Sequence, residues 1–417
     1  MKKKIAIIGS GISAMTCAYN LQDDYDVSIF EKNDYLGGHT HTHELQEEGK
    51  SFKVDTGFIV FNQETYPNLI KMFADLGVER QASNMSFSVY NKLNNLQYAS
   101  EDLSHLFAQR KNFISIRFWK FILEIKRFFK IALAEKDKIL DTKESIQEYC
   151  IRHNLSLFFI DNYLVPMSAA IWSTPQERAY DFPIALLLPF FHNHGLLNYG
   201  RQFQWYTVKG GSNTYIKKIV AENKLNINLQ EKVKSVHEKE GRVVVETTKN
   251  YYDFDFAVLA SHADESLALV RNLSQDKKDL LSLFTYNFNT AVLHTDESIM
   301  PPNKKAWASW NQIMERDKGR SLTSTIYWMN RLQKLPVKTN YFVSLNPFQK
   351  IEENKIIKKV DYYHPNFTTE NFARQKDLSL LNQNTKIFFA GAYFGYGFHE
   401  DGAKVGLEVA RELKNLK

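Results

Sequence analysis

An apolar run that breaks into closely spaced glycines constrains this chain more than any other feature. Lys4–Ile8 leads into Gly9, Gly11 and Ala14 in the spacing G-x-G-x-x-A, and helix-compatible residues follow. This order is typical of a strand, a tight turn and a helix. Gly9 permits the turn, Gly11 lets a pyrophosphate approach the backbone, and small Ala14 lets the helix pack on the strand. The segment therefore predicts a dinucleotide site with the phosphates at a helix N-terminus.

An acidic residue and a second glycine pair follow at informative distances. Glu31 ends the next predicted strand, 22 residues after Gly9. A carboxylate there can accept hydrogen bonds from ribose hydroxyls and would repel a 2′-phosphate. Six residues further on, Gly37 and Gly38 offer another close backbone approach. A glycine pair in this position resembles the extended fingerprint of two-domain FAD enzymes and not that of plain NAD dehydrogenases, so FAD is the favoured ligand.

Length and composition narrow the class of protein. A chain of 417 residues is expected to form two domains. The formal net charge of +6 is modest for this length, which argues against nucleic-acid binding. Cys17 and Cys150 fit no metal spacing and make a disulfide framework improbable, as expected in a reducing compartment. The chain lacks an apolar run of about 18 residues, so we predict a cytoplasmic protein without a spanning helix, with attachment to the inner face of the membrane left open.

Two segments after the glycine pair carry further candidates. If residues 39–45 form a strand, His39, His41 and His43 share one face, but a fourth metal ligand is not evident nearby. We therefore predict no metal site, and expect His39 to contact the cofactor. Val54–Phe61 is predicted to be a strand, in which Gly57 marks close approach by a ligand.

Residues 110–133 have apolar side chains at helical spacing and several interleaved Lys and Arg residues. Two interpretations stay open. The segment can be a helix of the substrate domain with a solvated basic face, or an amphipathic helix lying on anionic lipid.

An aromatic middle region supplies the substrate candidates. Pro166–Ser173 and Phe190–Leu197 are rich in aromatic residues and poor in charge, so they can line an apolar cavity or form core. His192 and His194 are either polar groups of a pocket or structural residues. The predicted substrate residues are Phe87, Trp172, His192, His194, Trp205 and Tyr396.

The C-terminal region completes the predicted cofactor site. A buried-type strand, Lys386–Ala392, is followed by Gly402 and Ala403 at the expected start of a helix. The N-terminus of a helix stabilises negative charge, and a reduced flavin carries negative charge on its pyrimidine side. His399 and Glu400, directly before this start, are predicted to act as a proton-transferring pair near the flavin. The alternative is that both residues cap the helix.

In this order and at these positions, the pieces resemble the flavin-containing amine oxidase superfamily of monoamine oxidases, phytoene-type desaturases and protoporphyrinogen oxidase. The motifs of that superfamily match Gly37-Gly38, Gly210-Gly211, the neighbourhood of Val233, and Ala390-Gly391 with Gly402-Ala403. Ser168–Ser173, Asn193–Leu197 and Trp205–Ser212 are more narrowly similar to a bacterial branch of predicted NAD/FAD-binding proteins. The resemblance implies an α/β fold: a Rossmann-type FAD-binding domain with an α+β substrate domain.

The chain also departs from the superfamily pattern. His39 stands where an arginine usually follows the glycine pair, and His399 falls at an aromatic-cage position. The lysine of amine oxidases near flavin N5 should fall near Asn289-Thr290, where there is none. A cysteine near Gly391 is also lacking, which implies non-covalent FAD. These departures weaken amine oxidation as the chemistry and leave flavin oxidoreduction intact.

The sequence thus predicts an FAD-dependent oxidoreductase of the desaturase or oxidase type, which removes hydride from an apolar, lipid-like substrate. An amine oxidase that produces hydrogen peroxide and a non-redox flavoprotein are the alternatives. The FAD-binding domain is expected to comprise residues 1–65, 206–272 and 384–417, and the substrate domain residues 66–205 and 273–383. The predicted cofactor-binding residues are Gly9, Gly11, Ser13, Ala14, Glu31, Lys32, Gly37, Gly38, His39, Thr56, Gly57, Val233, Gly391, Gly402 and Ala403.

Overall fold

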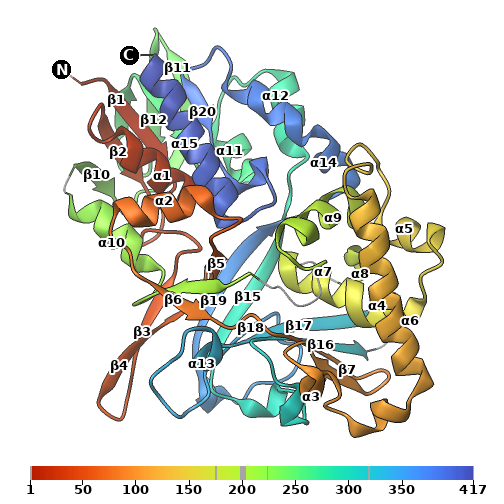
Figure 1. Ribbon diagram of the computed structural model, residues 1–417. Coiled ribbons are helices and arrows are strands. Elements are labelled where there is room, and N and C mark those ends of the chain that lie inside the picture. The colour runs from red at the N-terminus through yellow and green to blue at the C-terminus, as the bar shows by residue number, and fades with distance from the viewer. Residues whose placement is uncertain (1, 174–175, 198–202, 223, 318–319, 417) are drawn as a thin grey trace.

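A five-stranded parallel sheet forms the upper part of the computed structural model (Figure 1). The structure describes residues 2–416 apart from 174–175, 198–202, 223 and 318–319. The strand order is β10 (Leu225–Asn228), β2 (Asp26–Phe30), β1 (Lys4–Ile8), β14 (Phe256–Leu259) and β20 (Ile387–Phe389). These strands are short, apolar and buried, as expected for a parallel sheet that is covered on both faces.

Successive side chains of the strands enter two different cores, because they point to opposite faces of the sheet. Ile5 and Ile7 of β1 face helices, whereas Ala6 and Ile8 face the opposite core. The first core contains α1 (Ile12–Leu21), α2 (Pro67–Asp75), α10 (Asn213–Ala221) and α15 (His399–Asn415). The second contains the antiparallel sheet β11 (Val233–Lys239), β12 (Arg242–Thr247) and β13 (Tyr251–Phe254), with α11 (Ala263–Leu269) and α12 (Gln275–Ser282).

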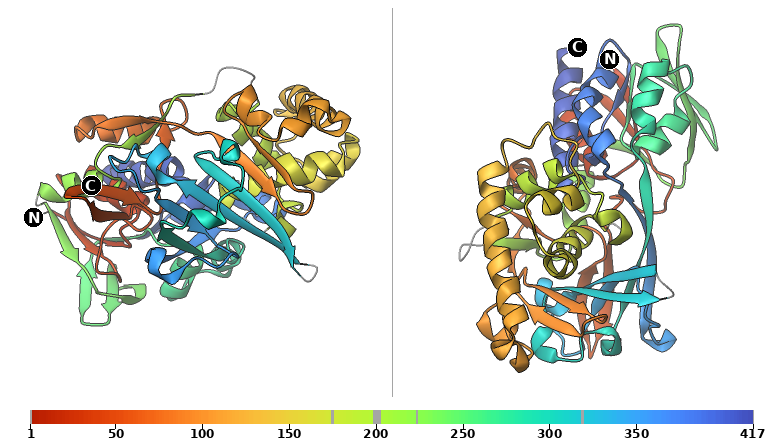
Figure 2. Two further views of the ribbon diagram at one scale, coloured as in Figure 1. Left: turned by 90° about the horizontal axis from the view of Figure 1, so that it is seen from below. Right: turned by 90° about the vertical axis from the view of Figure 1, so that its right-hand side faces the viewer.

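A seven-stranded sheet dominates the lower part of the molecule (Figure 1). Its order is β19 (Ile356–Pro365), β15 (Tyr286–His294), β18 (Phe342–Leu345), β17 (Arg320–Trp328), β16 (Trp310–Asp317), β7 (Phe87–Asn91) and β8 (Leu96–Ala99). All neighbours are antiparallel except β16 and β7. The long pair β15 and β19 extends toward the parallel sheet and joins the two parts (Figure 2).

The structure also contains two small sheets. One is the hairpin β3 (Thr42–Glu47) and β4 (Lys50–Asp55). The other joins β5 (Phe61–Asn62), β9 (Trp205–Val208) and β6 (Arg80–Ser83).

A group of helices covers one side of the lower part (Figure 2). They are α3 (Leu103–Leu106), α4 (Ile116–Glu135), α5 (Ile146–Arg152), α6 (Leu157–Phe159), α7 (Val165–Trp172), α8 (Gln176–Ala179) and α9 (Ile184–Asn193). Two further short helices are α13 (Met329–Leu332) and α14 (Thr369–Arg374). Across the described residues, none of the helices is both long enough and apolar enough to cross a membrane.

The structure corrects three predicted boundaries. Strand β3 begins only at Thr42, because the chain turns after the glycine pair, so His39 and His43 do not belong to one strand face. Strand β4 ends at Asp55, and the chain bends at Gly57 before β5. Helix α15 begins at His399 instead of Gly402, because the carboxylate of Asp401 accepts a hydrogen bond from Phe398 N at 2.9 Å and closes the first turn.

The parallel sheet draws its strands from all three segments assigned by sequence to the FAD-binding domain. The seven-stranded sheet draws its strands from the two segments assigned to the substrate domain. Strand β9 crosses the expected boundary between residues 205 and 206. The boundaries themselves stay a prediction.

Candidate functional site

The predicted nucleotide turn lies at the carboxyl end of β1, between β2 and β14. Gly9 has a φ of +96°, and a Cβ placed on it would lie 2.9 Å from the carbonyl oxygen of Ala260. The turn therefore requires glycine here. Gly11 precedes α1, and among the described residues no side chain caps this helix end. The N-terminus of α1 is thus available to an anion.

Glu31 connects the turn to the glycine pair. Its side chain is 5% exposed and accepts hydrogen bonds from Ser10 Oγ at 2.5 Å and from Asn33 N at 2.9 Å. Ser10 Oγ in turn accepts a hydrogen bond from Gly37 N at 3.1 Å. The nucleotide turn, Glu31 and the glycine pair are up to 28 residues apart in sequence, yet they lie together at one edge of the sheet.

The glycine pair brings the backbone close to the nucleotide turn. Gly38 has a φ of +57°, and a Cβ on it would lie 3.4 Å from Gly11 Cα. His39 follows, with its ring stacked on Tyr362 at 4.7 Å between centroids. His39 Nε2 is buried, and no described residue offers it a hydrogen-bond partner. An unpaired buried nitrogen is costly, so this atom points to a ligand.

Thr56 and Gly57 border His39. A Cβ on Gly57 would lie 2.1 Å from the carbonyl oxygen of His39, and that oxygen accepts a hydrogen bond from Phe58 N at 2.7 Å. Thr56 Oγ1 hydrogen-bonds to Tyr362 Oη at 2.9 Å. The backbone around Gly57 is therefore too close to His39 for any side chain.

Two predicted cofactor residues occupy less direct positions. Lys32 pairs with Glu265 at 2.5 Å and is exposed. Val233 is buried at the start of β11. The chain just before it reaches the site, since Glu231 N donates a hydrogen bond to the carbonyl oxygen of Glu31 at 2.9 Å.

The small residues of α15 serve close packing on α1. A Cβ on Gly402 would lie 2.6 Å from Ile12 Cγ2, and one on Gly406 would lie 2.4 Å from the carbonyl oxygen of Ser13. Ala14 and Ala403 are fully buried, and Gly391 faces the ring of Tyr393. The close contact between α1 and α15 therefore requires small residues at positions where the sequence motif predicted binding of phosphates and flavin.

His399 lies in the first turn of α15 and is held on two sides. Its Nε2 hydrogen-bonds to Thr40 Oγ1 at 3.0 Å, and its ring stacks on Phe58 at 3.7 Å. Burial lowers the pKa of His399 to about 3. The imidazole is therefore uncharged at neutral pH, which suits a hydrogen-bonding role better than proton exchange near pH 7.

Glu400 caps another helix. Its carboxylate accepts hydrogen bonds from Asn68 N at 3.0 Å, Asn68 Nδ2 at 2.7 Å and Leu69 N at 3.0 Å, at the N-terminus of α2. These bonds satisfy donors that the helix leaves free. The contacts favour a structural role for Glu400, and the catalytic assignment of His399 and Glu400 stays a prediction.

Aromatic side chains from four segments gather beside the start of α15. We call them the aromatic cluster: Trp172, Phe190, His194, Trp205, Tyr396 and Phe398. Trp172 Nε1 donates to the carbonyl oxygen of Tyr396 at 3.1 Å, and His194 stacks on Phe190 at 3.7 Å. Burial lowers the pKa of His194 to about 4, so its ring is uncharged.

The structure separates the remaining two substrate candidates from this cluster. His192 lies near the surface, where its Nδ1 is 3.4 Å from Asn193 Oδ1. Phe87 is buried in β7, in the hydrophobic core that also contains Trp172. Four of the six predicted substrate residues therefore come together.

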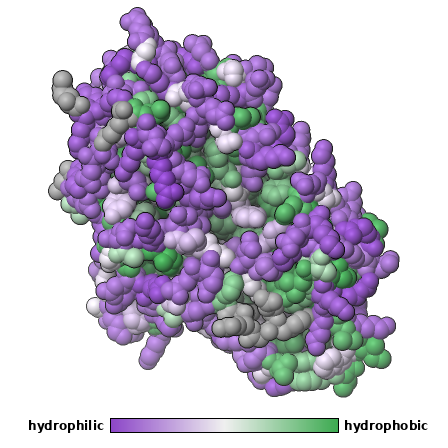
Figure 3. Space-filling view, turned by 45° about the horizontal axis from the view of Figure 1, so that its top comes forward, coloured by the Kyte–Doolittle hydropathy of each residue, from purple (hydrophilic) through white to green (hydrophobic). Residues whose placement is uncertain are grey.

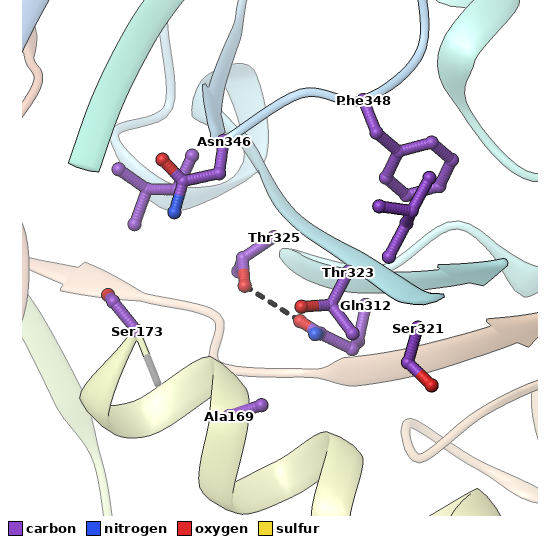
Figure 4. A pocket seen from close by; sticks show the side chains of 10 residues that line it. Ala169, Ser173, Gln312, Ser321, Thr323, Thr325, Asn346 and Phe348 are labelled. Carbon is purple, nitrogen blue, oxygen red and sulfur yellow. Dashed lines mark hydrogen bonds between the residues drawn. The ribbon is translucent and has the colours of Figure 1, made fainter. Parts of the chain in front are cut away.

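A cavity of about 230 Å³ lies between α7 and the seven-stranded sheet (Figure 4). Ala169 of α7 and Ser173, directly after this helix, face it, and the opposite wall holds uncharged polar side chains such as Gln312, Thr325 and Asn346. Thr325 Oγ1 donates a hydrogen bond to Gln312 Oε1 at 2.7 Å. Isolated polar residues carry no local signal, so this wall was not predicted from the sequence.

Asp55 is a second feature that sequence reasoning missed. Its buried carboxylate accepts hydrogen bonds from Ser212 N and Ser212 Oγ, from Thr42 Oγ1, and from Gln333 Nε2 at 2.7 Å. Burial raises the pKa of Asp55 to about 6, although these hydrogen bonds act to lower it. The sequence signal for this site was the position of Asp55, an acidic residue directly before Thr56-Gly57.

The fold and the site together define an α/β protein with a dinucleotide-binding part. An aromatic cluster lies beside the start of α15, next to this part. Comparison with known proteins gives the family. The model of the family described as flavin containing amine oxidoreductase matches residues 12–414. The chain therefore belongs to the flavin-containing amine oxidoreductase family, and it is an oxidoreductase.

Solved structures of similar fold cover at least 98% of the chain. A double mutant of putrescine oxidase has a TM-score of 0.73 at 12% identity, covering 100% of this chain and 99% of the other. A fatty acid isomerase from P. acnes, described as CLA-producing, has a TM-score of 0.69 at 13% identity, covering 98% of each chain. These likenesses show the fold.

One relative matches the chain in sequence over a short stretch. A 1-hydroxycarotenoid 3,4-desaturase from Flavobacterium sp. (strain P99-3) is 40% identical over 82 residues. That stretch is 18% of this chain and 15% of the desaturase.

Proposed function

We propose that this protein is an FAD-dependent oxidoreductase that removes hydride from a C–H bond of an apolar, lipid-like substrate. This proposal rests on the aromatic cluster. The one histidine in the cluster, His194, is uncharged at neutral pH. A bound flavin would supply hydride acceptance, and the chain would supply orientation and exclusion of water.

The nucleotide-binding part fits FAD. The uncapped start of α1 and the close approach of Gly38 to Gly11 suit a pyrophosphate, and Glu31 is placed for an adenosine ribose. His39, with its unpaired Nε2, would supply a polar group at the position where the superfamily pattern has an arginine. Burial raises the pKa of the thiols of Cys17 and Cys150 to about 12, which supports non-covalent binding.

The charges around the aromatic cluster favour an apolar substrate over an amine. The nearest carboxylates in sequence, Glu400 and Asp401, are occupied by helix-capping hydrogen bonds. Burial raises the pKa of Asp401 to about 6. An ammonium group beside the cluster would therefore compete with these backbone N–H donors for the two carboxylates.

The names of two similar proteins point the same way, whereas putrescine oxidase is named for an amine. The fatty acid isomerase and the 1-hydroxycarotenoid 3,4-desaturase are both named for substrates with long apolar chains. The uncharged cavity beside α7, lined by both polar and apolar side chains, would suit a hydroxyl or carbonyl group on such a chain. We assign the protein to the bacterial branch named above on its motifs alone.

The test is substrate-driven reduction of the flavin without oxygen. We expect purified protein to be yellow, to release FAD instead of FMN, and to lose its visible absorbance with unsaturated fatty acids or polyenes but not with amines. Hydrogen peroxide formed with an amine panel would support the amine oxidase alternative. Normal photoreduction without reduction by any organic substrate would support a non-redox role.

A further inference from the structure

Apolar side chains are exposed along the first half of α4 and the turn before it. Ile114 is 88% exposed, Ile116 75% and Leu123 60%, and Phe113 and Trp119 are exposed beside them. We call these five residues the α4 apolar patch. Exposed isoleucines at this density are unusual on a protein surface that contacts only water.

Helix geometry places the patch on the outer face of α4. The inner face buries Phe118, Phe121, Phe128, Phe129 and Ala132 in the large hydrophobic core of the lower part. Ile116, Trp119 and Leu123 are spaced three and four residues apart, so they share the opposite face. Figure 3 shows hydrophobic surface at the lower right, on the side where Figure 1 draws α4.

The patch is held rigidly. Trp119 Nε1 donates a hydrogen bond to the carbonyl oxygen of Phe113 at 2.9 Å. The ring of Phe113 stacks on the buried ring of Phe107 at 4.1 Å. Ser115 caps the helix, since its Oγ accepts a hydrogen bond from Phe118 N. The exposed apolar groups are therefore presented by an ordered turn and helix.

Positive charge surrounds the patch. Residues 110–133 contain seven Lys and Arg side chains and one Glu, so this segment alone equals the formal net charge of +6 of the whole chain. The single acid, Glu124, is turned toward Ser156, whose N and Oγ donate to it. Within the described part of the chain, Lys111, Lys120 and Lys130 make no ion pair.

We propose that this surface docks on an anionic lipid bilayer. Exposed isoleucine, leucine and tryptophan side chains can enter the interface, while lysines and arginines around them contact anionic headgroups. A second copy fits less well, because a symmetric contact would bring two patches of like charge together. Nucleic acid fits less well too, since the most exposed groups, Ile114 and Ile116, offer no stacking surface.

Docking here would set the proposed substrate region beside the bilayer. The buried face of α4 belongs to the same hydrophobic core as Trp172 and Phe190 of the aromatic cluster. A lipid-like substrate could then enter from the membrane. This consequence rests on the proposed function, whereas the docking itself does not.

The experiment is co-sedimentation of the full-length holoprotein with vesicles. We expect binding to phosphatidylcholine vesicles with about 30% phosphatidylglycerol at about 0.05 M NaCl, and release at about 0.5 M NaCl. Pure phosphatidylcholine should retain at least tenfold less protein. Equal retention by both vesicle types, or retention that ignores salt, would overturn the proposal.

Paired variants test the two components separately. Ile114→Ser with Ile116→Ser, and Lys120→Ala with Lys130→Ala, should each weaken binding to the anionic vesicles about tenfold or more. Leu380→Ser and Lys278→Ala, at exposed positions on other elements, are the matched controls. Unchanged flavin content would show that the variants are folded. The proposal is wrong if patch and control variants bind alike, or if the patch variants instead abolish self-association or binding to nucleic acid.

Discussion

At the residue scale, burial keeps the histidines around the site uncharged. Burial lowers the pKa of His194 and His364 to about 4 and that of His399 to about 3, while an unfolded histidine titrates near pH 6.5. The unfolded chain therefore binds more protons than the folded chain between about pH 3 and 6.5. Stability contributed by these residues is complete above pH 6.5 and is lost as the pH falls through this window.

We expect His399→Gln to make stability less sensitive to acid. The slope of the unfolding free energy against pH should fall by up to one proton, or about 1.4 kcal/mol per pH unit, between about pH 4 and 6. Urea denaturation of both proteins over this range measures the slope. Equal slopes would show that His399 titrates alike in the folded and unfolded chains. If His399 also transfers a proton to or from substrate, flavin reduction should slow by ~10²-fold or more.

Glu31 is the residue on which the choice of nucleotide rests. Glu31→Ala should weaken FAD binding by roughly 1.5–3 kcal/mol for each hydrogen bond lost to the charged carboxylate. Flavin titration of the apoprotein measures the change, with Glu353→Ala at an exposed site as the control. FAD affinity that survives the loss of Glu31 would contradict its role at the ribose.

At the scale of elements, the packing of α15 on α1 depends on the absence of a side chain. The Cβ of an alanine at position 406 would lie 2.4 Å from the carbonyl oxygen of Ser13, and this backbone atom cannot rotate away. Alanine favours a helix by about 1 kcal/mol over glycine, but the steric conflict outweighs this gain.

Gly406→Ala should therefore lower the free energy of unfolding by about 1–3 kcal/mol. Because α1 begins at the nucleotide turn, FAD occupancy should fall as well. Thermal unfolding and the flavin-to-protein ratio measure the two effects. Glu408→Ala, at an exposed position on the same helix, should change neither. If Gly406→Ala instead raised the free energy of unfolding, α1 and α15 would be able to move apart without a loss of stability.

At the scale of the molecule, Asp55 joins segments assigned to both predicted domains. It binds Ser212 at the start of α10 and Gln333 at the end of α13 through buried hydrogen bonds. Asp55→Ala would leave these donors without an acceptor, each at a cost of about 1–3 kcal/mol.

We expect Asp55→Ala to destabilise the protein by about 3 kcal/mol or more, and Asp55→Asn by less because it retains one acceptor oxygen. Chemical denaturation followed by both flavin and tryptophan fluorescence measures the loss. Asp276→Ala, at an exposed position, serves as the control. Stability equal to that of the control would show that the contact between the parts depends on other residues.

Local patterns predicted the fold class well. The run Lys4–Ile8, the turn at Gly9 and the helix after Gly11 are consecutive, so spacing alone identifies them. The family match confirms the flavin-containing class. Helix boundaries near the C-terminus were less accessible, because the start of α15 depends on how Asp401 folds back on Phe398.

By itself, the sequence determined the nucleotide-binding strand, turn and helix, the acidic residue after the second strand, and the amphipathic segment at residues 110–133. Each depends on residues within one or two turns of the chain. Only the tertiary structure decided that Glu400 caps α2 and that Trp172 meets Tyr396, because these partners lie 331–332 and 224 residues apart. Burial also set the protonation of His399 and Asp55, since desolvation depends on every element packed around a group.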